Sequence, residues 1–554
     1  MTVAEVIIRI VQNYGVRQIF GIPGDAINDL TDALRQQDET DFVLVRHEEA
    51  GALAAAAQAK LTGNLAVCMG TAGPGAIHLL NGLYDARHDH APVLAITGQV
   101  ETRYIGTSYH QEVDLERLFG DVAVYSQTIT SAGQVPAVIL EACRAAISAR
   151  GVAHVSLPTD VAGMKVDVSP AHFPASSLQR VMRPDRKDCA QAVKLIDDSH
   201  QVAILAGIGA AGARGELLEL ADRLGAPIVR TLRAKDFIDD DDQCCIGGLG
   251  LLGSKPAIRA MAACDLLLMI GTDFPYQEFY PEQARVIQID NTATQLGKRH
   301  RLDVGLLGDA APTIAELLVS LPRREQRSFL DSMLAEKADW LQQRDRLGSS
   351  DATPIKPQRL VAEVSSAAPD DAIFLCDTGT IDAWCARHLS VGEGQRFTLS
   401  SGLGSMAFAL PGALGAQLAY PDRRVIALTG DGGLNMLIAE FLTLVERQLP
   451  VVIVVVNNGK LGFIALEQEA KGLPEHSISF RNPDYVELAQ ACGGAGLRVE
   501  EPAMLADTLK EALALQQPVI VDVVVDPDEL VMPPRIELQQ AVNFTLAKAR
   551  ELIN

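Results

Sequence analysis

The chain has 554 residues, 48% of them hydrophobic and 21% charged, and its formal net charge at pH 7 is −22. This length predicts roughly three domains, each with its own core. The acidic balance argues against a nucleic-acid-binding protein, which normally presents a basic face. The nine cysteines form no C-x-x-C pair, which argues against a common zinc site and predicts a reducing compartment.

The N-terminal residues 1–16 interleave apolar side chains with Glu5, Arg9 and Gln12. This pattern predicts an amphipathic helix rather than a signal peptide, which needs an uninterrupted apolar segment. No stretch of the chain reaches the apolar length of a membrane span. We therefore expect a cytoplasmic protein.

Short apolar runs recur along the chain, each ending at Gly or Pro and leading into a helical pattern. The clearest are 65–70, 92–98, 201–207, 266–271, 372–379, 424–430, 451–456 and 518–525. Runs that are apolar on both faces are typical of parallel strands covered by helices. The pattern therefore predicts the α/β class, with three domains that each contain a doubly wound parallel sheet.

Two polar, proline-containing stretches interrupt this rhythm and are typical of linkers: one is 166–188, and the other runs from 321–328 through a charged helix to 348–358. We therefore expect three domains and a C-terminal segment. The predicted ranges are 1–180, 181–340, 350–530 and 531–554.

In the first domain, the run FVLVRHEEAGALAAAAQAK (42–60) predicts a strand followed by a helix that starts near Glu48 and Glu49. Carboxylates at a helix start are usually solvated and stabilised by the helix dipole, and we interpret Glu49 in this way. The loops GIPGD (21–25) and TAGPGAIHLLNGL (71–83) are glycine-rich, as turns after strands often are.

The middle domain also has glycine-rich turns after its predicted strands. They are AGIGAAGA (206–213), GGLGLLGS (247–254) and GTDFPYQEF (271–279), and the strand VIQIDN (286–291) follows them. Such turns favour dinucleotide binding, but the full G-x-G-x-x-G pattern is absent and a glycine run of this kind is weak evidence by itself.

The third domain contains GDGG (430–433) after one predicted strand and NN (457–458) after the next. The 24 residues 433–456 fit one crossover helix and one strand, so Asp431 and Asn458 should lie at the carboxyl ends of parallel strands, on the same edge of the sheet. A carboxylate, an amide oxygen and a backbone carbonyl suit Mg²⁺. The glycines beside Asp431 would let the backbone approach phosphate groups.

These motifs, together with SGLGSMAFALPGALGAQ (401–417), resemble the thiamine-diphosphate enzyme family, which includes acetolactate synthases, pyruvate oxidases and pyruvate decarboxylases. The resemblance covers nearly the whole chain. It implies that Asp431, Asn458 and the backbone oxygen of Lys460 bind Mg²⁺. It also implies that the Glu48 carboxyl hydrogen-bonds N1′ of the cofactor pyrimidine and so assists removal of the thiazolium C2 proton.

The resemblance further implies that three loops of the third domain contact thiamine diphosphate. The backbone of Gly404 would contact the pyrimidine and Met406 would bend the cofactor, while the other positions would hold the diphosphate. These positions are Gly379, Thr380, Gly404, Met406, Gly432 and Gly433.

Within this family the chain most resembles bacterial pyruvate oxidases of the quinone-reducing type, through segments in all three domains such as GTDFPYQEFYPEQARVIQID and NNGKLGFIALEQEAKG. The middle domain is then expected to bind FAD. The implied FAD positions are Gly207, Gly209, Thr272, Phe274, Pro275, Tyr276, Asp290 and Asn291. Acetolactate synthases also keep an FAD without redox use, so FAD binding alone does not identify an oxidase.

The loop after Asn458 separates these activities. In this resemblance the oxidases carry an aromatic residue at the position of Phe463 and Glu at that of Glu467, where the synthases carry Trp. The sequence therefore favours oxidative decarboxylation of pyruvate to acetate and CO₂, with a quinone as electron acceptor. The alternatives are an acetolactate synthase, an oxidase that uses phosphate and forms acetyl phosphate, and a catalytically silent nucleotide-binding protein on the same fold.

The family also implies a homotetramer, with each site formed between the first domain of one subunit and the third domain of its partner. The membrane-activated bacterial enzyme continues into an amphipathic lipid-binding tail, whereas this chain resembles it through FTLAKARELIN and stops at Asn554. We expect either a soluble relative or a trimmed chain, so contact with the inner face of the membrane stays open.

Overall fold

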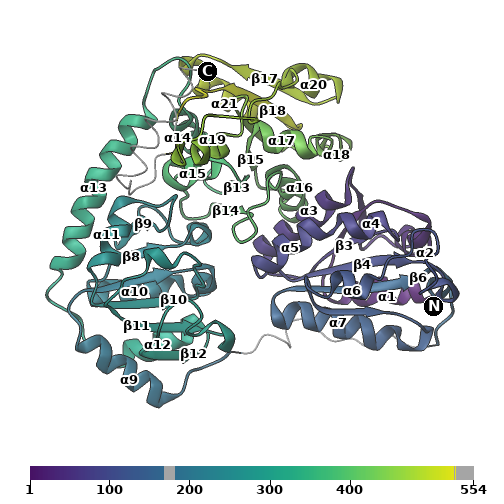
Figure 1. The fold of residues 1–554 in the computed structure, drawn as a ribbon, viewed down its shortest axis with the longest axis horizontal. Helices are drawn as coiled ribbons and strands as arrows, with labels where there is room; N and C mark the ends of the chain where they lie inside the picture. The colour runs from purple at the N-terminus through teal and green to yellow at the C-terminus, as the bar shows by residue number, and fades with distance from the viewer. Residues whose placement is uncertain (168–180, 530, 532–554) are drawn as a thin grey trace.

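The computed structural model describes residues 1–167, 181–529 and 531. They form three α/β units, each built on a six-stranded, all-parallel sheet (Figure 1). The predicted fold class is thus confirmed. Each sheet falls inside one of the predicted domain ranges, although the domain boundaries themselves stay predictions. The predicted C-terminal segment 531–554 lies outside the described residues except for Val531.

The first sheet has the strand order β2-β1-β3-β4-β6-β5. Its strands are β1 (Gln18–Gly21), β2 (Asp41–Leu44), β3 (Ala66–Gly70), β4 (Val93–Gln99), β5 (Ala123–Thr128) and β6 (Val152–Pro158). Successive residues of β3 enter different cores, because Ala66 and Cys68 pack in one cluster and Val67 and Met69 in another. Both faces of the sheet are therefore covered, as apolar runs without alternation predict.

The second sheet has the order β12-β11-β10-β7-β8-β9. Its strands are β7 (Val202–Ala206), β8 (Ile228–Arg230), β9 (Cys245–Gly248), β10 (Leu266–Ile270), β11 (Arg285–Asp290) and β12 (Val304–Leu307). The third sheet has the order β14-β13-β15-β16-β18-β17. Its strands are β13 (Ile373–Cys376), β14 (Arg396–Leu399), β15 (Val425–Gly430), β16 (Val452–Asn457), β17 (Ala495–Val499) and β18 (Val519–Val524).

Each sheet reverses its strand order next to its first strand. The reversal lies between β1 and β3, between β7 and β10, and between β13 and β15. At such a switch point the loops after the two strands diverge to opposite faces and leave a crevice at the carboxyl edge, where ligands of open α/β sheets bind. The fold thus provides three candidate crevices, and all the motifs singled out in the sequence follow strands at these edges.

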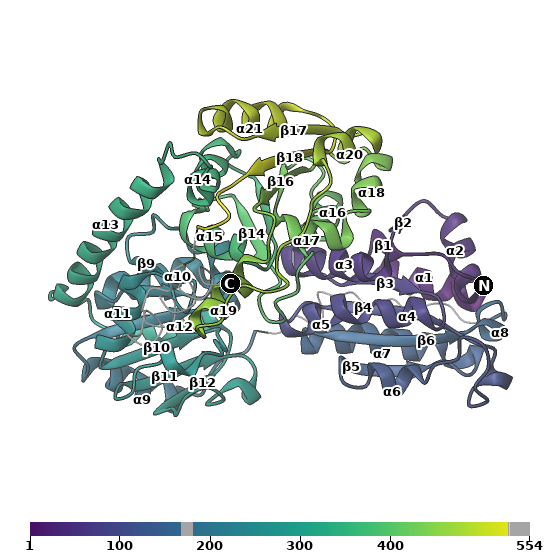
Figure 2. The same cartoon turned by 45° about the horizontal axis from the view of Figure 1, so that its top comes forward.

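Two helices join the first unit to the third. Helix α3 (Glu48–Thr62) packs along α16 (Ala409–Ala419), and one continuous core includes both. The two backbones approach so closely that a Cβ at Gly415 would collide with the carbonyl of Ala54. Figure 2 shows this helix pair between the first sheet and the third. Small residues are required here because larger side chains would separate the helices.

The long helix α13 (Ser328–Gly348) leads from the second unit to the third along the outside of the molecule (Figure 1). It packs against α11 (Lys255–Ala263) of the second unit and α14 (Pro357–Ala367) of the third. Within the described residues, no helix combines the length and hydrophobicity that crossing a bilayer would require.

Candidate active site

Asp431 and Asn458 lie together at the carboxyl edge of the third sheet, as the motif spacing predicts. Strands β15 and β16 are adjacent and parallel; Asp431 is the first residue of α17 (Asp431–Leu437), and Asn458 directly follows β16. Asp431 Oδ2 accepts a hydrogen bond from the backbone N–H of Gly459 at 2.6 Å. The aspartate therefore contacts the loop that carries Asn458 and Lys460.

The side chain of Asn482 also contacts Asp431 at this edge of the sheet. The sequence patterns do not point to this residue. Its Nδ2 donates to Asp431 Oδ2 at 2.7 Å and to Asn457 Oδ1 at 2.8 Å. The residue lies 51 positions after Asp431 in the chain. It stands in an irregular segment without a recognisable motif, so no local signal could have identified it.

The donor set at this edge of the sheet fits a hard cation. Burial raises the pKa of Asp431 above its ordinary value, although hydrogen bonds from Asn482 and from backbone N–H groups oppose this rise. A bound cation would favour the ionised carboxylate in this buried place. Carboxylate, amide and carbonyl oxygens are the ligands that Mg²⁺ prefers. The predicted metal residues Asp431, Asn458 and Lys460 thus suit the ion they are proposed to hold.

The two loops at the switch point of the third sheet meet face to face. Gly379 has φ +141°, a backbone conformation that side chains rarely adopt, and it caps α15 (Thr380–His388). On the other loop, a Cβ at Gly433 would collide with the carboxylate of Asp377. This close packing leaves the N-terminal N–H groups of α15 at the edge where a diphosphate is expected.

Two buried carboxyl groups lie next to this crevice, one directly after β13 and one in α15. Asp377 accepts hydrogen bonds from Thr429 Oγ1 at 2.6 Å and from the Ala409 N–H at 2.8 Å, and burial raises its pKa to about 6. Burial also raises the pKa of Asp382, in the first turn of α15, to about 8. Strongly shifted acids are typical of functional crevices, although buried structural acids shift too.

Met406 lies beside the diphosphate loops, as the family resemblance implies for the residue that bends the cofactor. Its terminal methyl is 3.5 Å from the position that a Cβ at Gly432 would occupy. Gly404 has φ +72°, and Met406 precedes α16 rather than lying within it. The side chain is therefore held by a loop at the crevice and is not part of a regular helical core.

Glu48 is the first residue of α3, and its side chain is 9% exposed. His78 Nδ1 lies 3.0 Å from Glu48 Oε2, and the His78 ring stacks on His47 with centroids 4.5 Å apart. Possible ligand atoms of His47, Glu48 and His78 all lie within 4.8 Å of one another, so the three side chains could also hold a metal ion. His78 is the last residue of α4 (Pro74–His78), in a segment where the sequence pattern points only to the glycines.

The interpretation of Glu49 as a solvated surface residue is wrong. Glu49 is half-buried, and its Oε1 accepts a hydrogen bond from Asn81 Nδ2 at 2.6 Å. Asn81 Nδ2 also lies 2.8 Å from Ser405 Oγ, between Gly404 and Met406. In addition, Glu440 Oε1 accepts from the backbone N–H groups of Arg46 and His47 at 2.7 and 3.0 Å. These long-range contacts attach the start of α3 to the third domain.

Phe463 and Glu467 both lie on α19 (Gly462–Ala470), one helical turn apart. The helix starts against the cofactor loops, since a Cβ at Gly462 would lie 2.9 Å from Thr380 Cγ2 and 3.3 Å from Asn458 Nδ2. Phe463 is half-buried and Glu467 is exposed. The first turn of α19 is thus adjacent to the predicted diphosphate and metal residues.

The predicted FAD positions cluster at the carboxyl edge of the second sheet. They follow the three adjacent strands β7, β10 and β11. A Cβ at Gly207 would collide with the carbonyl of Gly271, and the Gly209 N–H donates to that carbonyl at 3.0 Å. The glycines therefore let the two loops at the switch point approach each other. This crevice fits a dinucleotide site by its position in the fold.

The remaining FAD positions differ in burial. Thr272 and Phe274 are buried, whereas Pro275 and Tyr276 are exposed on the same loop. Asp290 ends β11, and burial raises its pKa. Asn291 Nδ2 donates to Asp309 Oδ1 at 3.0 Å. Exposed and polar side chains thus stand beside the glycine-rich crevice of the second sheet.

Comparison with known proteins gives three family matches, each of which overlaps one of the three sheets. The N-terminal TPP binding domain of thiamine pyrophosphate enzymes matches residues 1–118. The central domain of these enzymes matches residues 189–317, and their C-terminal TPP binding domain matches residues 377–523.

Relatives also match along the full chain. A putative thiamine pyrophosphate-containing protein, YdaP, of Bacillus subtilis is 40% identical, over 98% of this chain and 95% of its own. A pyruvate oxidase of Lactiplantibacillus plantarum is 34% identical, over 97% of this chain and 90% of its own. A probable acetolactate synthase large subunit of Methanococcus aeolicus is 32% identical, over 100% of this chain and 97% of its own.

Proposed function

Because the chain belongs to the thiamine pyrophosphate enzyme family in all three of its domains, we propose that it oxidatively decarboxylates pyruvate, with FAD and a quinone as electron acceptors. The balanced reaction is pyruvate, water and quinone giving acetate, CO₂ and quinol. Dependence on thiamine diphosphate is a property of the family. The substrate, the redox outcome and the roles of FAD and Mg²⁺ are our proposal.

When bound, thiamine diphosphate supplies a thiazolium carbon that adds to a carbonyl and an electron sink for decarboxylation. Asp431, Asn458 and the Lys460 carbonyl would hold Mg²⁺ against the diphosphate. The backbones of Gly379, Thr380, Gly432 and Gly433 would contact the diphosphate oxygens. Met406 would keep the two rings of the cofactor bent towards each other.

Glu48 would hold a proton between its carboxyl and N1′ of the pyrimidine. The contact with His78 involves only one carboxyl oxygen, Oε2, so Oε1 would be the oxygen that bonds the cofactor. Since the Glu48 side chain is largely buried, water competes poorly for this carboxyl. We also propose that the site is completed in a homotetramer, where the first domain of one subunit meets the third domain of its partner.

The observation that carries the oxidase assignment is the position of Phe463 and Glu467 on α19, which starts in contact range of Thr380 and Asn458. A synthase must hold a second 2-oxo acid here, and the family resemblance assigns that task to a Trp at the position of Glu467. With Glu there, the second 2-oxo acid is bound poorly, so transfer of electrons is favoured.

Anaerobic addition of pyruvate to the purified enzyme, followed by absorbance of the flavin, tests the proposal. An oxidase should lose its flavin colour and regain it with a soluble quinone, while acetate accumulates in proportion to the quinone reduced. Accumulation of acetyl phosphate only when phosphate is added would identify phosphate as the acyl acceptor instead of water. Rapid acetolactate formation with the flavin still oxidised would instead identify a synthase.

The Glu467→Trp variant makes the test specific to this position. It should shift product from acetate towards acetolactate, because the indole offers a surface for the second 2-oxo acid. Lys471→Trp places the same side chain one turn further along the chain, at the exposed end of α19, and should leave the product ratio unchanged. Equal product shifts in both variants would remove Glu467 from the argument.

A further inference from the structure

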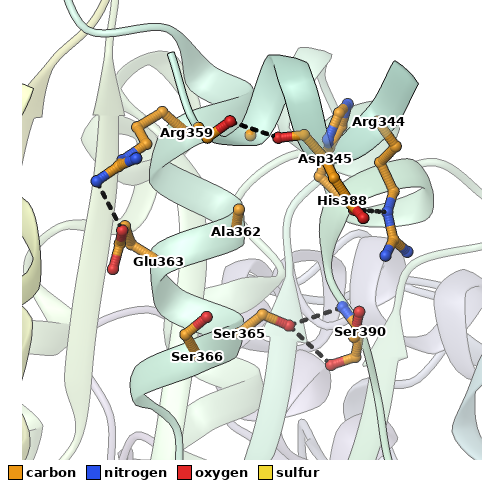
Figure 3. Close-up of a pocket in the computed structure, with 11 residues that line it drawn as sticks. Arg344, Asp345, Arg359, Ala362, Glu363, Ser365, Ser366, His388 and Ser390 are labelled. Atoms are coloured by element: carbon orange, nitrogen blue, oxygen red, sulfur yellow. Dashed lines mark hydrogen bonds and ion pairs between the residues drawn. The ribbon is translucent and has the colours of Figure 1, made fainter. Parts of the chain in front are cut away.

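A separate cavity lies between the C-terminal turns of α13 and helices α14 and α15 (Figure 3). Its volume is about 370 Å³, which lies at the lower end of the range for small-molecule sites. Figure 3 shows Arg359 and Glu363 on one side of the cavity, Arg344 and His388 on the other, and Ser365, Ser366 and Ser390 below them. We call this cavity the α13–α15 pocket.

The pocket contains buried hydrogen-bonding groups without partners. His388 is 7% exposed, and its Nδ1 has no partner among the described residues. The same holds for the buried Nε of Arg359. Buried donors are nearly always paired in folded proteins, because leaving one unpaired costs about 1–3 kcal/mol. Both atoms are therefore hydrogen-bonding groups in the wall of the pocket that no described residue satisfies.

Arg344 adds a charged donor to the same pocket. Its side chain is 19% exposed, contacts Asp345 through Nε at 3.1 Å, and lies 6.0 Å from the ring centre of Trp340. Among the described residues its two terminal NH₂ groups have no protein acceptor. A guanidinium with free terminal N–H groups matches the oxygens of carboxylate and phosphate groups.

The acidic residues of the pocket do not cancel this preference. The Asp345 side chain is 68% exposed and is therefore solvated. Glu363 binds the Nη2 of Arg359 at 2.9 Å and leaves Nε unpaired. Burial, together with the charges of Arg344, Arg387 and Lys235, lowers the pKa of His388 to about 3. His388 is thus neutral at pH 7.

We propose that the α13–α15 pocket binds a small oxyanion, carrying a carboxylate or a phosphate group, through Arg344 and His388, which lie on the same side of the cavity. A cation would be repelled by Arg344, and an apolar ligand would leave the terminal N–H groups of Arg344 without an acceptor. Helix α15 runs from Thr380 to His388, so its length of about 13 Å separates the pocket from the predicted diphosphate loop. The pocket is therefore a second site, distinct from that of thiamine diphosphate.

Direct binding measurements test the proposal without reference to turnover. The protein is saturated with thiamine diphosphate, Mg²⁺ and FAD, so that the sites proposed for these groups are filled. It is then titrated calorimetrically with inorganic phosphate and, separately, with succinate. We expect saturable uptake of one anion per chain for at least one probe. The probe that binds identifies the oxyanion as a phosphate or a carboxylate.

Two variants locate the binding. Arg344→Gln should weaken uptake roughly tenfold or more, the usual effect of losing a charge-assisted hydrogen bond. Arg346→Gln is the matched control, because Arg346 is exposed on the same helix and does not line the pocket. His388→Asn should also weaken uptake while leaving the far-ultraviolet circular dichroism unchanged. Equal weakening in Arg344→Gln and Arg346→Gln, or no saturable uptake of either probe, would overturn the proposal.

Discussion

At the scale of single residues, Glu48 and His154 show how the same fold handles two buried polar groups. Glu48 is the first residue of α3, and its Oε2 lies 3.0 Å from His78 Nδ1. His154 lies inside the first sheet, with Thr97 Oγ1 and Ser126 Oγ each 2.8 Å from its ring nitrogens and Phe119 stacked on the ring. The first arrangement leaves an oxygen free for a ligand, whereas the second satisfies the whole side chain.

We predict that Glu48→Gln lowers turnover on the order of 10²-fold or more, because glutamine keeps the shape but cannot exchange the proton. Exchange of the thiazolium C2 proton, followed by NMR after rapid quenching, should slow in parallel while cofactor retention is preserved. Glu49→Gln keeps an acceptor for Asn81 and should keep most of the turnover. Wild-type C2 exchange in Glu48→Gln would remove Glu48 from the mechanism.

His154 should make stability depend on pH. Burial lowers its pKa from 6.5 to about 3 in the folded protein. The unfolded chain therefore binds a proton at higher pH than the folded one, so stability falls as pH decreases from about 6.5 towards about 3, by up to about 1.4 kcal/mol per pH unit.

His154→Asn should reduce the change of the free energy of unfolding with pH in this range, whatever its effect on the absolute stability. Denaturant unfolding between about pH 7 and pH 5 measures the slope. His200→Asn, at an exposed position, should leave the slope unchanged. Identical slopes in wild type and His154→Asn would show that His154 protonates as easily in the folded protein as in the unfolded chain.

At the scale of elements, the α3–α16 pair determines how the first and third domains meet. Both helices are rich in Ala and Gly and are buried over most of their length. Neither has a clear apolar and polar face, which is expected for a helix covered all round. Their small side chains allow close approach, so the interface depends on backbone shape more than on individual side chains.

We predict that Gly415→Ala destabilises the protein by about 1–3 kcal/mol, the usual cost of overpacking, since the new Cβ would collide with the Ala54 carbonyl. Gly412→Ala is the matched control on the same helix, because its Cβ would meet only side-chain atoms, at 3.3–3.4 Å. That variant should destabilise the protein less than Gly415→Ala does, because side chains can shift more easily than a backbone carbonyl and Ala has the better helix propensity. Thermal unfolding compares the two, and equal midpoints would contradict the proposed close contact.

At the scale of the whole molecule, one buried ionic cluster joins all three domains. Lys60 Nζ is fully buried and lies 2.7 Å from Asp85 Oδ2 and 2.6 Å from Asp89 Oδ2. Lys60 also donates to the Leu399 carbonyl of the third domain at 3.0 Å, and Arg233 of the second domain donates to the Asp89 carbonyl at 2.6 Å. Burial opposes ionisation of Asp89, but the charges of Lys60 and Arg233 outweigh it and hold its pKa below the ordinary value.

Lys60→Met should therefore destabilise the protein by roughly 3–5 kcal/mol, because it leaves two buried carboxylates without their main counter-charge. The loss of stability relative to the wild type should become smaller as pH is lowered, because protonation of the two carboxylates removes their unpaired charge. Lys187→Met, at an exposed position, should change little. Denaturant unfolding of the three proteins at two pH values measures these effects, and a deficit independent of pH would point to lost packing rather than lost charge.

The sequence by itself determined the fold class and the meeting of Asp431 and Asn458 at one edge of the third sheet. Parallel strands buried on both faces leave continuous apolar runs, and a crossover of fixed length places Asp431 and Asn458 at one edge. These are local patterns, so they are visible in the order of residues. The same is true of Phe463 and Glu467, whose spacing of four places them on one helical face.

Only the tertiary structure decided which distant side chains complete these motifs. Asn482 reaches Asp431 across 51 positions and His78 reaches Glu48 across 30. Glu49 turned out to be half-buried because Asn81 and the third domain cover it. The α13–α15 pocket likewise needs three helices to meet. Such contacts depend on how finished elements pack, and packing is set by shape complementarity between surfaces that no local pattern in the chain encodes.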